Sequence, residues 1–442
     1  MMSRQKPVID ATATDESSLI LALLSVIVGG ASGLIGATFR LALAQADHVR
    51  DVLIAWAHGR RFAGLLLIMA MCATATAIAA WLVRRYSPQA SGSGIPHVEA
   101  VLNGELPQAP FLLIPVKFIG GLLAIGCGLA LGREGPSVQM GASVAHLLGK
   151  VFRRPWPDCR ALLAAGAGAG LATAFNAPIA GAIFVLEELV RRFDTRITIA
   201  TFGASAGAIA VSRVLLGQSP DFHVGPLPFA GFGALPVYLA LGIIAGLLGV
   251  AYNRALLGAL AAADRSRRWP VELRAAAVGA QVGLLAWFAP RIVGGGDAIT
   301  QRALDGVDAL GIVSLVLIIR FGLGAISYAA QTPGGLFAPM LVLGAQSGLI
   351  FGTVCCRWFP GVAASPAPFA VVGMAAFFTA VVRAPLTGII LVTEMTGSFT
   401  LLLPMLGACF AATLVPTLLR NGPIYDSLRE RALHPPQWRD VS

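Results

Sequence analysis

Gly132-Arg133-Glu134-Gly135-Pro136 lies inside an otherwise apolar stretch, and the same glycine and proline frame returns as Gly335-Leu336-Phe337-Ala338-Pro339. A carboxylate in hydrocarbon is costly, so an ionisable residue at membrane depth predicts a functional site. Glycine lets the backbone bend, and proline suits the first turn of a helix. Both segments are therefore expected to open helices. Their free N–H groups and positive dipole ends would favour an anion.

The composition is that of a protein with many membrane spans. The 442 residues are 56% hydrophobic and only 12% charged, with a mean hydropathy of +0.77. Residues 19–39 and 62–83 are uncharged and long enough to cross a bilayer as helices. Glycine and proline interrupt the other long apolar segments, around residues 111–152, 161–190, 330–357 and 367–397. Non-helical backbone survives at membrane depth only in protein or beside a wet cavity. The prediction is an all-α polytopic membrane protein with broken helices, a transporter or channel.

The chain repeats itself at nearly constant spacing in three blocks, which occur in the same order. The blocks pair Gly92-Ser93-Gly94 with Gly294-Gly295-Gly296, Lys117 with Arg320, Gly132 with Gly335, Ala177-Pro178 with Ala384-Pro385, and Glu187 with Glu394. We expect one domain of two homologous halves, residues 19–222 and 223–430, between a cytoplasmic tail of residues 1–18 and a short tail of residues 431–442. Inverted halves with the site between them are favoured, as in transporters built on such repeats.

Glu134 is predicted to act as a gate. It lies among helix-start amides, where its charged carboxylate can occupy the place that an anion would take. Burial favours the protonated form and the amides favour the charged form, so protonation can change within a transport cycle. Glu187 and Glu188 precede Arg191-Arg192 and are expected near a helix end at a cytoplasmic boundary. They either pass protons to Glu134 or are ordinary solvated or salt-bridged charges.

Other features of the sequence are weighed against this interpretation. Lys117 and Arg320 either pair with buried acids or raise the positive potential of a pore. The net charge of +10 comes from residues scattered between spans, which disfavours nucleic-acid binding. The six cysteines are expected to pack in the core, with no metal or cofactor.

Two serine motifs suggest a remote alternative, an intramembrane serine hydrolase. Ser32 lies in Gly30-Ala31-Ser32-Gly33, and Ser205 lies in Gly203-Ala204-Ser205-Ala206-Gly207. The second motif would need a strand before its helix to expose the serine, whereas this segment has the composition of a membrane helix. Runs of small residues also serve helix packing in membranes.

The three segments Gly92–Pro96, Gly132–Pro136 and Gly335–Pro339 resemble the selectivity-filter signatures of the CLC chloride channel and transporter family. The likeness extends from about residue 20 to 430 and includes Pro423-Ile424-Tyr425. It implies a CLC-like fold of two inverted halves with tilted and broken helices. It also implies a homodimer in membrane lipid with one pore per subunit, located in the inner (plasma) membrane. The chain resembles the prokaryotic type, without the C-terminal CBS domains of eukaryotic members.

The resemblance further implies residues that bind the anion. The hydroxyls of Ser93 and Tyr425 and the backbone amides of Leu336 and Phe337 would hold chloride. Ser93 matches the chloride-type filter. Weaker backbone candidates are Arg133, Gly135 and Ala338.

The same resemblance assigns roles to two acids. Glu134 would be the external gate and proton acceptor, and Glu188 matches the internal proton-transfer residue that exchangers carry. The expected function is therefore proton-coupled chloride exchange. The alternative is a passive chloride channel of the same fold, gated by voltage or pH.

Overall fold

The computed structural model describes residues 11–227, 231–266, 268–358 and 365–434, and the regular structure in these residues is helical. The first half contains α1 (Ala11–His58), α2 (Arg61–Tyr86), α3 (Ile95–Leu102), α4 (Leu113–Gly126), α5 (Glu134–Val151), α6 (Trp156–Phe175), α7 (Pro178–Phe184) and α8 (Thr195–Leu216). The second half contains α9 (Leu235–Arg265), α10 (Val271–Phe288), α11 (Asp297–Asp305), α12 (Leu310–Ala329), α13 (Phe337–Trp358), α14 (Ala367–Val382), α15 (Pro385–Thr396) and α16 (Leu402–Leu418). A last helix, α17 (Ile424–Leu433), follows both halves. The short helical turns are η1 (Pro88–Ala90), the π-helical η2 (Val185–Leu189), η3 (Phe232–Ala234) and η4 (Pro290–Ile292).

The two halves match helix for helix, and the matched residues take equivalent places. The repeat pairs Lys117 of α4 with Arg320 of α12, and it pairs the residues that open α5 with those that open α13. Helices α4 and α5 are separated by a loop, as predicted from the glycines, and so are α12 and α13. The predicted boundary at residue 222 falls in the connection between α8 and α9.

The contact between α7 and α15 establishes that the halves are inverted. Glu187, just after α7, accepts hydrogen bonds from the N–H groups of Leu386 and Thr387 at the start of α15 (3.0 and 2.7 Å). Glu394, near the end of α15, accepts from Ile179 and Ala180 at the start of α7 (3.1 and 2.7 Å). Each helix end therefore caps the start of the other helix, which is possible only if the two helices run antiparallel.

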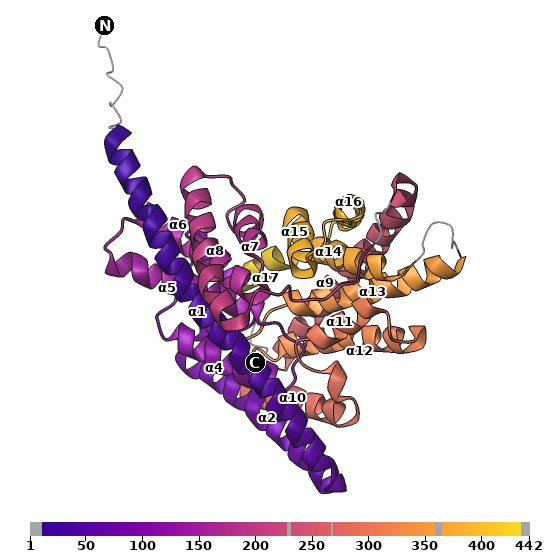
Figure 1. Ribbon diagram of the computed structural model, residues 1–442. Coiled ribbons are helices and arrows are strands. Elements are labelled where there is room, and N and C mark those ends of the chain that lie inside the picture. The colour runs from indigo at the N-terminus through magenta and orange to yellow at the C-terminus, as the bar shows by residue number, and fades with distance from the viewer. Residues whose placement is uncertain (1–10, 228–230, 267, 359–364, 435–442) are drawn as a thin grey trace.

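Helix α1 is longer than the span expected at residues 19–39. Its apolar part covers 41 residues from Ser18 to His58, which at the rise of an α-helix is about 60 Å, twice the hydrocarbon thickness. Figure 1 shows it as the long indigo helix along one side of the molecule. Charges do not end this helix because they are paired: Arg40 forms an ion pair with Asp221 (2.6 Å) and Arg50 with Asp47 (2.5 Å).

Parts of the predicted tails are described. Residues 1–10 and 435–442 lie outside the described residues, α1 begins at Ala11, and α17 continues to Leu433.

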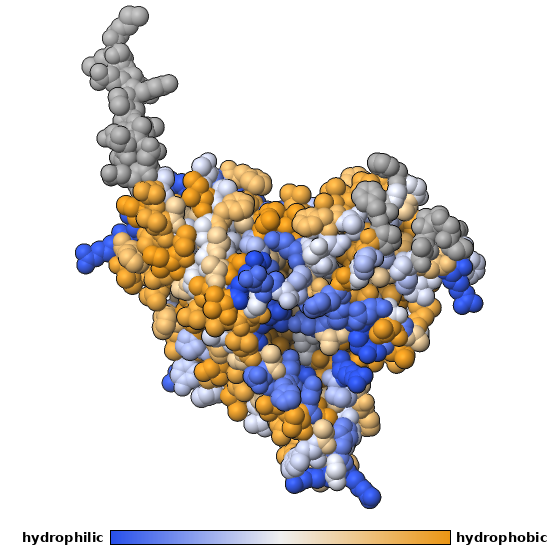
Figure 2. All heavy atoms as spheres, viewed as in Figure 1, coloured by the Kyte–Doolittle hydropathy of each residue, from blue (hydrophilic) through white to orange (hydrophobic). Residues whose placement is uncertain are grey.

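The surface and the core are both apolar, as expected of a protein embedded in lipid. Seven helices are long and apolar enough to span a membrane, counted over the described residues. Figure 2 shows orange, hydrophobic residues over much of the visible face, with hydrophilic residues gathered around its centre. The helices α5, α6, α13 and α14 are almost entirely buried, so they form the core in which the site lies.

Candidate functional site

The two glycine and proline loops meet at the centre of the molecule. Gly132 N–H donates to the Gly335 carbonyl (2.8 Å), and Gly335 N–H donates to the Gly132 carbonyl (2.7 Å). The loops thus form an antiparallel bridge between the halves, from which α5 and α13 begin. A Cβ at Gly132 would lie 2.0 Å from Glu134 Oε2, so only glycine leaves room for the carboxylate here. The sequence prediction that both segments open helices is confirmed.

The third loop packs against the other two. Ser93 precedes α3, and a Cβ at Gly135 would lie 2.4 Å from Ser93 Oγ and 2.6 Å from the Ser93 carbonyl oxygen. Gly334 N–H donates to the Gly92 carbonyl (3.0 Å), which joins this loop to the segment leading into α13. Helix starts from both halves therefore face one small region.

Glu134 is buried in that region. Its residue is 1% exposed, and Oε2 accepts a long hydrogen bond from Ala338 N–H at the start of α13 (3.4 Å). Oε1 has no hydrogen-bond partner in the part of the chain that the structure describes. Helix-start amides stabilise a negative charge, so the carboxylate occupies a place suited to an anion. Among the described residues, the long hydrogen bond from Ala338 N–H holds the carboxylate there.

Two buried hydroxyls and an aromatic ring form another part of the site. Ser93 and Tyr425 are both fully buried, and neither hydroxyl has a hydrogen-bond partner of normal geometry among the described residues. The Phe337 ring is stacked on Tyr425 with centroids 6.2 Å apart. An unpartnered buried hydroxyl is costly, so the pair is equipped to donate to a ligand. The N–H groups of Leu336 and Phe337, at the start of α13, have no partner within that helix.

Among the described residues, Lys117 and Arg320 form no ion pair with an acid, so the acid-pairing alternative considered for them is wrong. Lys117 Nζ donates to the carbonyls of Ala90 and Gly92 (3.0 and 2.7 Å). Arg320 donates from Nη1 to Gly294 and from Nη2 to Gly295 (2.7 and 3.0 Å). Each buried cation binds the glycine loop of its own half. The pairing was missed because backbone carbonyls leave no signal in side-chain composition.

Glu188 lies in a second charged region, away from Glu134. It is 3% exposed, sits in the π-helical turn η2 and forms an ion pair with Arg191 (3.5 Å). Arg191 also donates from Nη1 and Nη2 to the Asp426 carboxylate (3.2 and 2.6 Å), and its Nη2 lies 3.5 Å from Glu99 Oε1. Asp426 follows Tyr425 directly in the sequence. Tyr425 is thus next to a residue that shares Arg191 with Glu188.

Glu187 has a different environment from its neighbour. Besides the two N–H groups of α15, its carboxylate accepts the Thr387 hydroxyl (2.7 Å). In the described part of the chain, Glu187 thus has neither the solvated nor the salt-bridged environment that was the alternative to a proton route, because both oxygens cap the start of α15.

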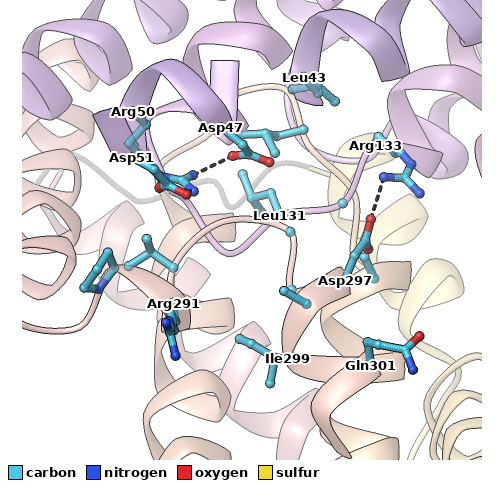
Figure 3. Close-up of a pocket in the computed structure, with 18 of the residues that line it drawn as sticks. Leu43, Asp47, Arg50, Asp51, Leu131, Arg133, Arg291, Asp297, Ile299 and Gln301 are labelled. Atoms are coloured by element: carbon cyan, nitrogen blue, oxygen red, sulfur yellow. Dashed lines mark hydrogen bonds and ion pairs between the residues drawn. The ribbon is translucent and has the colours of Figure 1, made fainter. Parts of the chain in front are cut away.

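A cavity of about 630 Å³ adjoins Glu134. Figure 3 shows its lining, with Arg133 directed at Asp297 and Arg50 at Asp47. Gly132, Glu134 and Ala338 line it together with these charged residues. Glu134 therefore lies in the wall of this cavity, which we call the vestibule.

The serine motifs are explained by helix packing. Ser205 lies inside the continuous helix α8, so the strand that a hydrolase elbow requires is absent from the described segment. Helices α1 and α8 pack closely: a Cβ at Gly29 would lie 2.0 Å from the Ala204 carbonyl oxygen, and one at Gly33 2.5 Å from that of Ala208. Small residues allow such approach of helix backbones.

Sequence reasoning missed several charged residues at both ends of the site. Asp297 and Asp221 hold Arg133, while Asp426 and Glu99 hold Arg191. Only Asp426 could have been found from the sequence, because it directly follows Tyr425, a predicted site residue. The other partners lie far apart along the chain.

Comparison with known proteins gives consistent matches. Residues 75–417 match the family model described as voltage gated chloride channel. The H(+)/Cl(-) exchange transporter ClcA of Cronobacter sakazakii is 37% identical over 95% of this chain and 91% of its own length. The protein of the same name from Yersinia pestis bv. Antiqua (strain Angola) is 38% identical over 95% and 89%. The crystal structure of a slow cyanobacterial Cl⁻/H⁺ antiporter superposes with a TM-score of 0.89 at 33% identity, covering 93% of this chain and 98% of that one.

Proposed function

The chain belongs to the voltage-gated chloride channel family, and from that premise we propose that it is a transporter, not an enzyme, which exchanges chloride for protons. The relatives named as exchangers cover nearly its whole length. The observation that carries the proposal is the Glu134 carboxylate between the starts of α5 and α13, with a second buried acid, Glu188, paired with Arg191. A passive channel needs no second acid on a proton route.

The proposed cycle alternates a carboxylate and a chloride ion at one place. Ionised Glu134 sits on the helix-start amides and closes the vestibule. When it takes a proton from the external side, its hold on the amides weakens and the side chain leaves. Chloride then binds to the hydroxyls of Ser93 and Tyr425 and the amides of Leu336 and Phe337, aided by the backbone of Arg133, Gly135 and Ala338. Because these donors carry only partial charges, the ion can leave as well as enter.

Glu188 is proposed to exchange the proton with the cytoplasm. The arginines around it, Arg191 and Arg192, fit the positive-inside bias of cytoplasmic loops. Chloride moving in and a proton moving out carry charge in the same direction, so the cycle is electrogenic. We place the protein in the inner (plasma) membrane as a homodimer with one pore per subunit, surrounded by lipid.

Reconstitution into liposomes tests this function. A chloride gradient is expected to drive protons uphill through the wild-type protein. Glu134→Gln, which mimics the protonated gate, should abolish proton movement while chloride still passes. Glu188→Gln should also uncouple the two ions. Glu430→Gln, at an exposed site on α17, is the matched control and should leave coupling intact.

The outcomes separate the exchanger from the channel. Chloride flux without uphill proton movement in the wild type would assign a passive channel. Retained coupling in Glu134→Gln would remove the gate role from this residue.

A further inference from the structure

Arg133 is a cation beside the proposed anion path, and two acids hold it in place. Its Nη1 donates to Asp297 Oδ2 (2.7 Å), Nη2 lies 3.5 Å from Asp221, and Nε donates to the Ala174 carbonyl (3.1 Å). The side chain is only 15% exposed. A full positive charge next to Glu134 would bind an anion tightly if it were free to turn toward it. What restrains Arg133 therefore bears on how strongly the vestibule holds chloride.

Asp297 is placed for this role by the second glycine loop. It is the first residue of α11 and follows Gly296, whose φ of 104° suits glycine. Arg320 fixes the loop through its carbonyls, as described above. In the repeat Asp297 corresponds to Ile95, so the first half has no acid at this position. The Asp297 carboxylate is therefore a feature of the second half alone.

The charge of Asp297 faces the vestibule. Its side chain is 53% exposed, and Figure 3 shows it directed at Arg133 in the lining of the cavity. Burial by the surrounding walls raises the pKa of Asp297, but the Arg133 ion pair and hydrogen bond, with Arg40 and Arg320, leave it below the ordinary value. The group is therefore ionised near neutral pH and repels an approaching anion.

The other charges of the vestibule are mostly paired among themselves. On α1, Arg50 binds Asp47 and Asp51 (2.5 and 3.0 Å). On α11, Arg302 binds Asp308. Arg291 of η4 lines the cavity without an ion pair in the described part of the chain. Removing the charge of Asp297 would thus change both the net charge of the vestibule and the partner set of Arg133.

We propose that Asp297 sets the affinity of the vestibule for external chloride, by holding the Arg133 guanidinium away from the anion path and by opposing anion entry. The proposal rests on the proposed function in taking the vestibule as the external chloride entrance. Asp297 is a positioning residue in its action through Arg133, and its own charge adds a direct repulsion of the anion. It keeps external chloride weakly bound, so that the ion can leave again.

Loss of the carboxylate has a second consequence, for the gate. Without Asp297, Arg133 retains one acid at 3.5 Å, and the adjacent Glu134 carboxylate becomes its alternative partner. A nearby cation stabilises the ionised carboxylate. More acidic external solution is then needed to release Glu134. Chloride affinity and pH dependence should therefore change together.

Chloride flux in right-side-out and inverted membrane vesicles tests the proposal on each side separately. In Asp297→Asn the external chloride concentration for half-maximal flux should fall about threefold to tenfold, as expected when one unit charge a few ångströms from the anion is removed. The external pH profile should move to lower pH, and the internal half-saturation should stay unchanged. Asp297→Glu should restore wild-type values.

Asp308→Asn is the matched control, because it removes the same charge from the partner of another vestibule arginine and leaves Arg133 paired. It should change the half-saturation by less than about twofold, since an exposed pair contributes little. An unchanged external half-saturation in Asp297→Asn, or a shift equal to that of the control, overturns the proposal. So does failure of rescue by glutamate.

One further variant and the choice of readout keep the result decisive. If Asp297→Asn does not fold, Asp221→Asn, which removes the more distant acid, should give a smaller shift in the same direction. Half-saturation is measured from chloride flux alone. It therefore tests Asp297 whether or not protons are coupled, and wild-type vesicles that move no protons uphill would refute only the exchanger assignment.

Discussion

Replacing Glu394 by glutamine should weaken the contact between α7 and α15 by about 2 kcal/mol. Its two oxygens accept the N–H groups of Ile179 and Ala180 at 3.1 and 2.7 Å. Glutamine keeps the shape but has one acceptor, so one N–H loses its partner, at a cost of about 1–3 kcal/mol. Losing the charge at a helix start adds about 0.3–1 kcal/mol. The equivalent change at Glu187 should cost about the same, about 2 kcal/mol, because the glutamine oxygen can replace the Oε2 that accepts both the N–H and the hydroxyl of Thr387 (2.7 Å each), and only the Leu386 N–H loses its partner.

The assay is reversible unfolding in mixed detergent micelles, followed by intrinsic tryptophan fluorescence. Glu430→Gln supplies the control for removing an exposed charge. The double variant of Glu187 and Glu394 should be less destabilised than the sum of the single ones, because both caps join the same two helices. The reasoning fails if either Glu394→Gln or Glu187→Gln costs no more than the control.

Three other changes test particular contacts. Gly135→Ala should weaken chloride binding at least severalfold in calorimetric titration, because the new Cβ would lie 2.4 Å from Ser93 Oγ; unchanged affinity would contradict the packing. Lys117→Met should destabilise the protein by about 2–4 kcal/mol, because the carbonyls of Ala90 and Gly92 lose a charged donor at 3.0 and 2.7 Å. Stability equal to wild type in the same unfolding assay would argue against a stabilising role of these two hydrogen bonds. Ser32→Ala and Ser205→Ala should leave chloride flux within about twofold of wild type, because both serines serve helix packing; abolished flux in folded protein would contradict this.

The parts of the fold that depend on backbone geometry could be predicted from the sequence. Glycine and proline at Gly132–Pro136 and Gly335–Pro339 act locally, so the starts of α5 and α13 were predicted correctly. The repeat predicted the two halves for the same reason, since matched residues need matched backbone. Helix ends were harder to predict, because the uncharged span was expected to end at Phe39, before Arg40, although α1 continues to His58.

Partners that lie far apart in the sequence could not be predicted. Asp297 and Arg133 meet because two loops from different halves converge, and nothing near either residue indicates the other. For Lys117 the sequence left two alternatives, and the structure supplied a third, its own half's backbone carbonyls. The roles of Glu134 and Glu188 stay predictions, supported by burial and position.

The bridge between Gly132 and Gly335 limits how the protein can move. Many transporters built on repeats work by rocking one repeat against the other around a fixed site. Here such rocking would break two hydrogen bonds between the halves at the site itself, in a buried place where water cannot replace them. The halves therefore form a stiff frame, and only side chains such as that of Glu134 need to change position. A frame that keeps its outline during turnover does little work against the bilayer, so the rate should depend weakly on lipid thickness.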